Sequence, residues 1–354
     1  MTRSHCRQAT GETDVHSDLV VARYPSRDLM LDLYVPADTA GPCPVVVWVH
    51  GGAFIRGDRK KMPEQYGALA SQGIAVAGIE YRLSHEATFP AQLFDVRAAI
   101  RYLRSHAAAL GIAPDALGLW GASAGGHLAA LAGLLGNRER LPGEGDVHGD
   151  VSVRAVAEAY GPTDMTASAP PPKLATLPGL SGPSWSDRFL GGAPDELPEI
   201  AEAASPLHHV RPDAPPFQIC HGTTDDLVSW RHSWNLHTAL VAAGVESELY
   251  LLDGYRHGFI NAARRGDLEA DNLLDGGRLA AEGAAAARRY GDATGNGHDA
   301  DFGFGDVASF FARHLPVPHM KGITLAKARP PSHPGVAVST CSPAARGHGQ
   351  GLPS

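Results

Sequence analysis

The stretch Leu117-Gly118-Leu119-Trp120-Gly121-Ala122-Ser123-Ala124-Gly125-Gly126 places a single serine between small residues at the end of an apolar run. The pattern Gly-x-Ser-x-Gly within it is typical of a sharp strand-to-helix turn that raises a serine hydroxyl above the edge of a sheet. Such a turn favours glycine because it leaves little room for a Cβ and often needs a positive φ. Since 41 of the 354 residues are glycine, the motif is weak by itself and its surroundings must be examined.

Around this motif, apolar runs typical of strands alternate with segments of helical spacing. A β-branched run at 44–49 is typical of a strand buried on both faces, and apolar residues at 89–110 step by three and four as in an amphipathic helix. Ser123 falls between an expected strand at 116–120 and an expected helix at 127–135. The remaining expected strands lie at 18–23, 29–35, 74–79, 151–157, 217–220 and 247–252, and the remaining helices at 62–69, 233–243 and 306–315. This alternation predicts an α/β fold with a mostly parallel central sheet and helices on both faces.

Two internal segments and both ends of the chain depart from this alternation. Residues 163–216 are rich in Pro, Gly and Ser and are expected to form a cap or lid excursion. Residues 262–305 are expected to be an insertion, with a weak helical pattern at 279–290. The polar residues 1–16 suggest a flexible leader, and the Pro- and Gly-rich residues 316–354 suggest a disordered tail. The folded domain is therefore expected to span 17–315.

The composition of the whole chain argues against several classes of partner. The formal net charge is −8, whereas nucleic-acid binding needs concentrated Lys and Arg. The chain has no apolar run of about 18 residues, as a membrane span requires, and the leader lacks the apolar core of a signal peptide. The four cysteines have neither metal nor disulfide spacing, and Cys43 and Cys220 lie in apolar contexts typical of buried thiols. We expect a cytoplasmic protein that binds no nucleic acid, membrane, metal or cofactor, with its oligomeric state left open.

A nucleophilic serine needs oxyanion donors, a general base and an orienting acid, and each has a candidate after an expected strand. The stretch His50-Gly51-Gly52-Ala53-Phe54 follows the strand at 44–49, and its glycines allow backbone N–H groups to point at a developing oxyanion. The stretch His221-Gly222-Thr223-Thr224-Asp225-Asp226 follows the strand at 217–220, and His257 follows the strand at 247–252. Taken singly, the first stretch is better read as an ordinary Gly-rich turn, and the aspartates can be read as a helix cap. Together they stand in the order serine, acid, histidine.

This set of motifs resembles the α/β-hydrolase superfamily. Within it, the best match is the group that contains feruloyl and acetylxylan esterases (BD-FAE-like proteins), kynurenine formamidase and hormone-sensitive-lipase-like carboxylesterases. The resemblance extends from about residue 20 to 261 and resumes at 306–315. The matching stretches are His50-Gly51-Gly52-Ala53-Phe54, Tyr81-Arg82-Leu83-Ser84, Phe89-Pro90, Gly121-Ala122-Ser123-Ala124-Gly125-Gly126, Ser205-Pro206-Leu207, Pro215-Pro216-Phe217, His221-Gly222-Thr223-Thr224-Asp225 and His257-Gly258-Phe259. The resemblance implies an α/β-hydrolase fold.

The resemblance also implies a role for each candidate residue. Ser123 would be the nucleophile and His257 the general base. Asp225 would be the acid, because the family places it four residues after the histidine of the His-Gly pair, although a shift of one residue would select Asp226 instead. The oxyanion donors would be the N–H groups of Gly52, Ala53 and Ala124, and the expected substrate-binding residues are Phe54, Trp185 and Val228.

Two further family positions bear on these roles. Tyr81, Arg82 and Asp95 recur in the family pattern and are interpreted as a buried polar support. Ala53 stands where the lipase form of the loop has a third glycine, so activity on esters of tertiary alcohols is not expected.

The implied function is hydrolysis of carboxylic esters through an acyl-enzyme, with a small-molecule ester as substrate. A short acyl group is expected because residues 163–216 carry few large apolar side chains with which to bury a long one. The alternatives on the same triad are an amidase or formamidase of the N-formylkynurenine type and a small peptidase. A non-catalytic hydrolase fold that serves as a binding module is disfavoured because no triad residue is missing.

Overall fold

A ten-stranded sheet organises the part of the chain that the structure describes. The structure is a computed structural model, and it describes residues 13–316 except 38, 40, 64–65, 138–140, 142, 145–147, 167–182, 263–272 and 293. The strands are β1 (Thr13–Arg23), β2 (Asp28–Pro36), β3 (Cys43–Val49), β4 (Ala75–Ile79), β5 (Ile112–Ala122), β6 (Ala155–Ala159), β7 (Phe217–Gly222), β8 (Ser247–Leu252), β9 (Ala285–Tyr290) and β10 (His298–Phe302).

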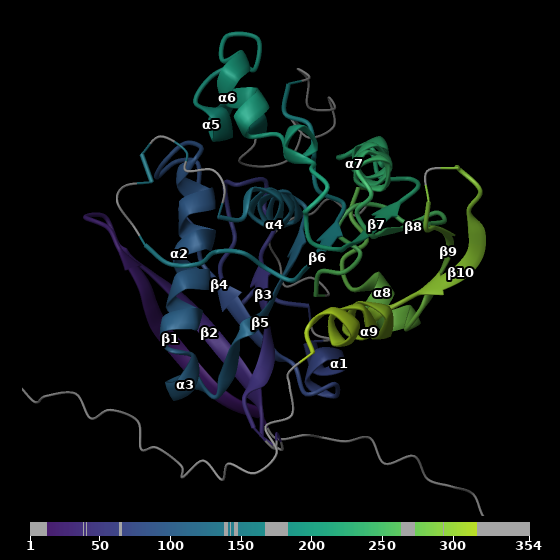
Figure 1. Ribbon diagram of the computed structural model, residues 1–354. Helices are drawn as coiled ribbons and strands as arrows, with labels where there is room; N and C mark the ends of the chain where they lie inside the picture. The colour runs from purple at the N-terminus through teal and green to yellow at the C-terminus, as the bar shows by residue number, and fades with distance from the viewer. Residues whose placement is uncertain are drawn as a thin grey trace, which may run out of the picture. The chain divides into compact units, whose positions relative to one another are not determined.

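The order of the strands shows a parallel centre with an antiparallel hairpin at each edge (Figure 1). Across the sheet the order is β1-β2-β4-β3-β5-β6-β7-β8-β9-β10. The six strands from β4 to β8 in this order are parallel, whereas β1, β2, β9 and β10 pair antiparallel with their neighbours. The prediction of an α/β fold with a mostly parallel sheet is therefore confirmed.

Helices cover both faces of this sheet. They are α1 (Gly67–Ala70), α2 (Ala91–Ser105), α3 (Ala107–Leu110), α4 (Ala124–Leu135), α5 (Trp185–Leu190), α6 (Pro198–Ala203), α7 (Arg231–Ala242), α8 (Arg278–Glu282) and α9 (Phe304–His314), with a 3₁₀ turn η3 at Pro206–His209. Several expected helices differ in extent: the helix expected at 89–110 is divided near His106 into α2 and α3, and the helix expected at 62–69 is reduced to α1.

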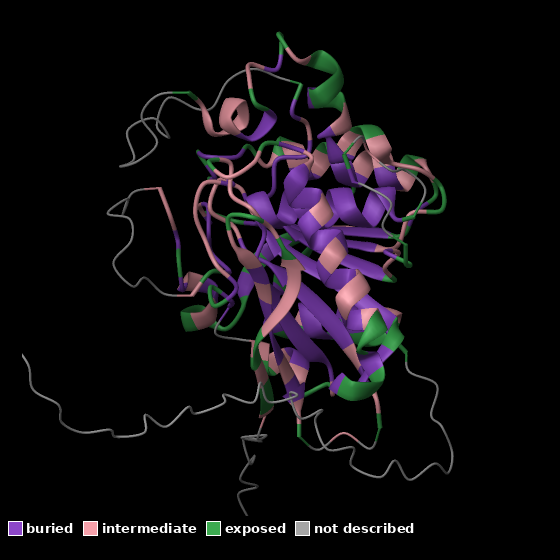
Figure 2. Cartoon of the chain, turned by 90° about the vertical axis from the view of Figure 1, so that its left-hand side faces the viewer, coloured by how far each residue is buried: buried purple, intermediate pink, exposed green. Residues whose placement is uncertain are grey.

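The side chains of the central strands point alternately to the two faces of the sheet, which explains why helices must cover both faces. In β3, Val47 and Val49 belong to one buried cluster, together with side chains of α2, α4 and α7. Val46 and Trp48 belong to the other cluster, together with Leu69 of α1 and Phe311 of α9. Successive side chains of a strand point to opposite faces, so an all-apolar strand must be covered twice. Figure 2 shows the resulting buried interior, in which strands and the helix faces against them are almost continuously purple.

The first strand begins inside the expected leader. Residues 13–16 belong to β1, which pairs with β2 from Thr13 opposite Pro36. This strand lies at the edge of the sheet and most of its side chains are partly or fully exposed. Its first residues pair with β2 through backbone hydrogen bonds, which a hydrophobicity pattern does not report. Residues 1–12, the rest of the expected leader, lie outside the described residues.

The helical interpretation of 279–290 is wrong in its second half. The helix α8 ends at Glu282, and Ala285–Tyr290 forms β9, which pairs antiparallel with β8 and with β10. Alanine and arginine favour helices in isolation, but β8 would otherwise expose a row of unpaired backbone groups at the sheet edge. The insertion 262–305 thus extends the sheet. Residues 317–354, where a disordered tail is expected, lie outside the described residues.

Candidate active site

Ser123 lies on a strained turn between β5 and α4. Its φ is 55° and its ψ is −123°, an unfavourable conformation for a residue with a Cβ. The Ser123 N–H donates to the carbonyl oxygen of Ala159 at the end of β6, 2.8 Å away. The neighbouring strand therefore holds the backbone of the turn in place, and α4 begins at the next residue.

Glycines make this turn possible because it presses against the end of β3. A Cβ added at Gly125 would overlap the carbonyl oxygens of Val49 and His50, and one added at Gly121 would overlap the backbone of Gly125. Both glycines of the Gly-x-Ser-x-Gly motif are therefore required, because a side chain at either position would overlap neighbouring backbone atoms.

We expect Gly125→Ala to displace α4 from β3 and to inactivate Ser123. Forcing a methyl group against backbone costs about 3 kcal/mol, or about 5 °C in melting temperature for a domain of about 300 residues. Thermal denaturation and labelling by a fluorophosphonate measure the two effects. Gly305→Ala, in α9 with nothing within 4 Å of the added Cβ, is the matched control and should be neutral or stabilising. Unchanged stability and labelling in Gly125→Ala would contradict the packing argument.

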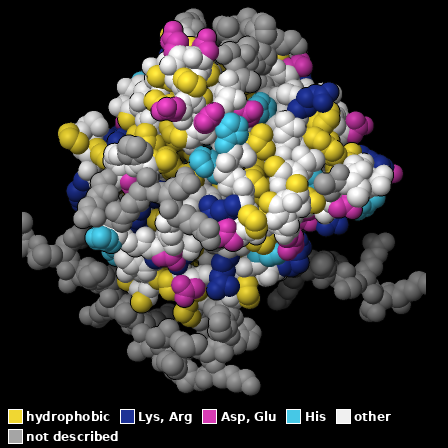
Figure 3. Space-filling model, turned by 45° about the horizontal axis from the view of Figure 1, so that its top comes forward, with side chains coloured by type: hydrophobic (Ala, Val, Ile, Leu, Met, Phe, Trp, Pro, Cys, Tyr) yellow, Lys and Arg dark blue, Asp and Glu magenta, His cyan; other side chains and the backbone are white. Residues whose placement is uncertain are grey.

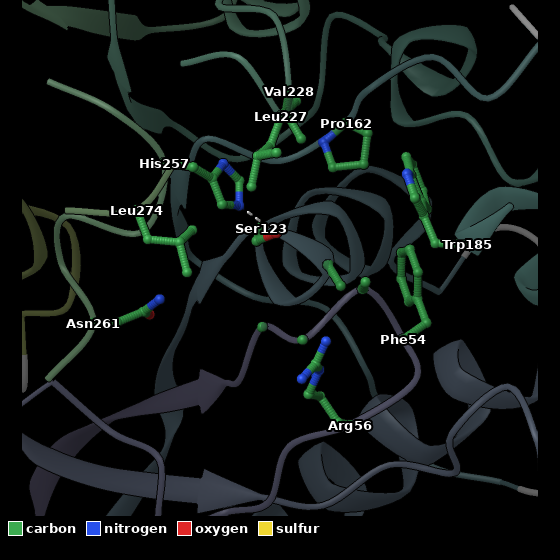
Figure 4. Close-up of a pocket in the computed structure, with 14 residues that line it drawn as sticks. Phe54, Arg56, Ser123, Pro162, Trp185, Leu227, Val228, His257, Asn261 and Leu274 are labelled. Carbon is green, nitrogen blue, oxygen red and sulfur yellow. Dashed lines mark hydrogen bonds between the residues drawn. The ribbon is translucent and has the colours of Figure 1, made fainter. Parts of the chain in front are cut away.

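The structure brings Ser123, His257 and Asp225 together in one hydrogen-bonded row (Figure 4 shows the first two). The Ser123 Oγ lies 2.9 Å from His257 Nε2, and His257 Nδ1 lies 2.6 Å from Asp225 Oδ2. Nδ1 donates its hydrogen to the carboxylate, which leaves Nε2 with the lone pair that accepts the serine proton. These residues follow β5, β8 and β7 respectively, at the carboxyl ends of parallel strands.

The carboxylate of Asp225 is held by four donors. Its Oδ1 accepts the N–H groups of Leu227 and Val228, both at 2.9 Å. Its Oδ2 faces Nδ1 of His257 at 2.6 Å and Nε2 of His221 at 3.2 Å. Burial by itself would raise the pKa of Asp225, but the charge of His257 and the hydrogen bonds from both histidines hold the pKa well below its usual range. Asp226 is exposed. Of the two candidate aspartates, the structure therefore places Asp225 against His257.

The loop after β3 turns its backbone toward Ser123. Gly52, Ala53 and Phe54 all have positive φ, at 127°, 55° and 60°, and the N–H groups of Ile55 and Arg56 close the turn on the Gly52 carbonyl. Gly52, Ala53 and Ala124 line the same cavity as Ser123. The structure therefore places all three predicted oxyanion donors beside the serine.

Polar groups under this loop hold it in place. The Tyr81 hydroxyl donates to the His50 carbonyl at 2.9 Å, and the two rings stack with centroids 4.3 Å apart. Burial lowers the pKa of His50 to about 4, so its ring is neutral near pH 7. Arg82 forms an ion pair with the fully buried Asp95, which also accepts a hydrogen bond from Tyr24. The predicted support by Tyr81, Arg82 and Asp95 thus corresponds to these contacts.

The cavity in front of Ser123 has an apolar side and a polar side (Figure 4). It measures about 130 Å³. The predicted residues Phe54, Trp185 and Val228 all line it, and the ring of Phe54 stacks on Phe189 at 3.9 Å and on Trp185 at 5.9 Å. The sequence analysis assigned no role to six further lining residues, namely Gly51, Arg56, Pro162, Leu227, Asn261 and Leu274.

Two of the missed residues could not have been found from the sequence. Leu274 reaches the cavity because a short bridge pairs it with His257, and it lies in the insertion where no motif occurs. Arg56 is four residues beyond Gly52 in the oxyanion loop, and only the tight turn directs its guanidinium back into the cavity. Leu227, in contrast, lies between Asp226 and the predicted residue Val228, so its place in the sequence could have indicated it.

The described surface carries both apolar and charged side chains. Figure 3 shows hydrophobic side chains interspersed with acidic and basic ones, with acidic side chains gathered toward the upper end. The exposed acidic residues in and beside α6 include Asp195, Glu196 and Glu199. Within the described residues, no cluster of three or more metal-binding side chains occurs and no helix is long and apolar enough to cross a membrane.

A serine at the β5–α4 turn, an acid after β7 and a histidine after β8, all at one edge of a parallel sheet, define the α/β-hydrolase class. Within that class, the chain belongs to the BD-FAE family, which matches residues 31–240. The match includes Ser123 and Asp225, while His257 lies beyond its end.

Similar proteins include esterases of known name. The chain is 33% identical to esterase LipQ of Mycobacterium tuberculosis over 241 residues, which is 67% of this chain and 56% of that protein. It is 31% identical to esterase LipC of the same organism over 239 residues, which is 67% of this chain and 55% of that protein. The chain thus spans about half the length of the curated relatives it matches.

Solved structures with the same fold are also esterases. A truncated carbohydrate esterase from gut microbiota is 28% identical with a TM-score of 0.59, and the match covers 71% of this chain and 90% of that one. Esterase Est2 of Thermogutta terrifontis with bound butyrate is 27% identical with a TM-score of 0.56, and the match covers 75% of this chain and 90% of that one. Forms of that esterase have also been solved with bound propionate and after phosphonylation by sarin.

Proposed function

We propose that this chain is a serine carboxylesterase that hydrolyses esters of short acyl groups. The observation that carries the proposal is the continuous row from Asp225 through His257 to Ser123, whose hydroxyl opens into a cavity. The family membership and the esterase names of the relatives support the reaction type.

In the first half of the reaction, Ser123 Oγ attacks the ester carbonyl carbon while His257 Nε2 takes its proton. The oxyanion accepts hydrogen bonds from the N–H groups of Ala124 and of Gly52 or Ala53. Each such donor contributes about 2.7–4 kcal/mol to the transition state. His257 then gives the proton to the leaving alcohol, which produces an acyl group on Ser123.

In the second half, His257 removes a proton from a water molecule that attacks the acyl-enzyme, and Ser123 is released with the free acid. Asp225 keeps His257 in the required tautomer in both halves and stabilises the imidazolium that forms each time. This scheme uses side chains and backbone groups of the chain alone.

The preference for short acyl groups is argued from the walls of the cavity. Trp185, Phe54 and Leu274 line the cavity of about 130 Å³, and the Phe54 side chain is fully buried against Phe189. Each additional buried CH₂ contributes about 0.8 kcal/mol only where a wall can cover it. The similar esterase with bound propionate and butyrate supports acyl groups of this size.

The test is the dependence of kcat/KM on acyl length, measured with p-nitrophenyl esters from acetate to laurate below their micelle concentrations. We expect a maximum at four carbons or fewer. Trp185→Ala should move the maximum to longer chains because it removes one wall. Trp230→Ala, which changes a partly buried tryptophan that does not line the cavity, should leave the maximum in place.

Three results would contradict the proposal. A steady rise of kcat/KM beyond eight carbons would indicate a lipase. A higher kcat/KM for N-formylkynurenine than for any ester would indicate a formamidase on the same triad. Absence of both turnover and fluorophosphonate labelling would indicate a binding module.

A further inference from the structure

A second row of buried polar side chains continues from Asp225 away from Ser123. His221 Nε2 lies 3.2 Å from Asp225 Oδ2, and His221 Nδ1 lies 2.7 Å from the hydroxyl oxygen of Ser233. That hydroxyl lies 3.3 Å from Oε2 of Glu158. His221, Ser233 and Glu158 are at most 1% exposed, and they come from β7, α7 and β6. The triad is therefore connected to a carboxyl group on the neighbouring strand.

The surrounding backbone leaves room for the carboxyl group of Glu158. The Gly161 N–H donates to its Oε1. A Cβ added at Gly161 would lie 2.7 Å from Oε1, and one added at Gly126 in the first turn of α4 would lie 2.9 Å from it. Glycine at both positions thus allows a carboxyl group to sit beneath the helix that follows the nucleophile. Burial raises the pKa of Glu158 to about 8.

The hydrogen positions along this row are decided by counting donors and acceptors. Nε2 of His221 faces two oxygens that can only accept, Asp225 Oδ2 and the Val228 carbonyl at 2.9 Å. Nε2 therefore carries a hydrogen. Two arrangements then satisfy the remaining atoms. In one, Glu158 is protonated and donates to Ser233, whose hydroxyl donates to Nδ1 of His221. In the other, that proton is on Nδ1, and the hydroxyl donates to the Glu158 carboxylate.

Both arrangements contain the same number of protons, and removal of one disrupts the row. Nδ1 of a neutral His221 and the carboxylate of Glu158 would then both need the single hydrogen of Ser233. One acceptor would stay unpaired, and two buried carboxylates would lack a balancing charge.

We propose that one proton shared between Glu158 and His221 keeps His221 donating to Asp225, and thereby holds Asp225 in position to orient His257. Glu158, Ser233 and His221 are positioning residues for the reaction, and loss of the shared proton inactivates the enzyme at alkaline pH. The inference rests on the proposed function.

The other titratable groups around this row keep one charge state across the relevant pH range. Burial raises the pKa of Cys220 and of Tyr160 well above their usual values, so both stay neutral. Burial lowers the pKa of His127 to about 4 and also lowers the pKa of His232, so both rings are neutral above about pH 7. Asp164, whose pKa is lowered by hydrogen bonds to Thr166 that outweigh its burial, stays ionised.

The decisive variant is Glu158→Gln. Its amide oxygen can accept the Gly161 N–H and its amide nitrogen can donate to Ser233, so the complete hydrogen-bond pattern is kept without a titratable proton. For the wild type, we expect kcat/KM for p-nitrophenyl acetate to fall about tenfold between about pH 7 and pH 9, since a group with a pKa of about 8 is then about one-tenth protonated. For Glu158→Gln, we expect a change of less than about twofold over the same range.

Two serine variants separate this role from simple structural support. Ser233→Ala breaks the row and should lower kcat/KM about three- to tenfold near pH 7, and its kcat/KM should then stay constant up to pH 9 instead of showing the alkaline fall. The matched control is Ser247→Ala, which removes another buried serine that contacts a histidine, His237, at 2.9 Å. This control should lower the melting temperature but keep the wild-type pH profile. Ser233→Ala also provides the test if Glu158→Gln does not fold.

Fluorophosphonate labelling of Ser123, followed over the same pH range, distinguishes failure of this inference from failure of the proposed function. If no ester is hydrolysed but the labelling rate falls at alkaline pH in the wild type and not in Glu158→Gln, the shared proton is supported and the esterase proposal fails. A wild-type labelling rate without an alkaline fall, or an equal fall in Glu158→Gln and the wild type, would overturn the inference. The inference would also be overturned if Glu158→Gln changed the melting temperature but kept the pH profile of the wild type.

Discussion

Ser123→Ala is expected to lower kcat/KM for p-nitrophenyl acetate by about 10⁴-fold or more, because the proposed acyl-enzyme cannot form without the hydroxyl. The residual rate would come from substrate binding and the oxyanion donors alone. Fluorophosphonate labelling followed by peptide mass analysis should identify Ser123 in the wild type and no modified residue in the variant.

The folded state of Ser123→Ala should be intact, since the backbone bond from residue 123 to Ala159 does not involve the side chain. An unchanged melting temperature would therefore assign the lost activity to chemistry. Ser105→Ala, at an exposed serine that bonds only within its own helix turn and to His106, is the control and should keep full activity. Labelling that persists in Ser123→Ala would refute the assignment of the nucleophile.

Asp225→Asn is expected to lower kcat/KM by about 10⁴-fold. The amide oxygen would accept the N–H groups of Leu227 and Val228, which turns the amide nitrogen toward His257. Nδ1 of His257 must then accept, so the hydrogen moves to Nε2, which can no longer take the proton of Ser123. The same amide nitrogen would also face Nε2 of His221, which carries a hydrogen, so two donors would point at each other.

Asp226→Asn is the matched comparison because it makes the same chemical change one residue away, at an exposed side chain. We expect a change in kcat/KM of less than about threefold, as is usual for exposed charges. Steady-state kinetics of the two variants at one pH, together with their melting temperatures, measure the difference. A larger loss for Asp226→Asn than for Asp225→Asn would show that the acid has been misassigned.

Parts of the fold were predictable because their sequence pattern reports a local physical requirement. The β-branched run that became β3 has no polar side and had to be buried on both faces, and the spacing in α2 had to present one apolar stripe. The edges were not predictable in this way. The second half of β1 was predicted at 18–23, but its first residues, 13–17, are mostly polar and mostly exposed, so they carry no pattern that distinguishes them from a leader. The strand β9 contains alanine and arginine, which also suit a helix.

Within the site, the motif positions were predictable and the lining residues were not. Ser123, Asp225 and His257 lie within five residues of the ends of β5, β7 and β8, and parallel strands end at one edge of a sheet, so their approach follows from strand order. Leu274 and Arg56 reach the cavity through a bridge and a turn whose geometry depends on packing.

The sequence by itself determined the alternation of strands and helices, the turn that carries Ser123, and the order in which the candidate acid and base follow it. Each of these is a local property, because the periodicity of side chains and the steric needs of a turn act over a few residues. Only the tertiary structure decided which aspartate faces His257, which strands complete the sheet at its edges, and that Glu158 reaches Asp225 through Ser233 and His221. These contacts join residues from different strands and helices, so they depend on how β6, β7 and α7 pack together.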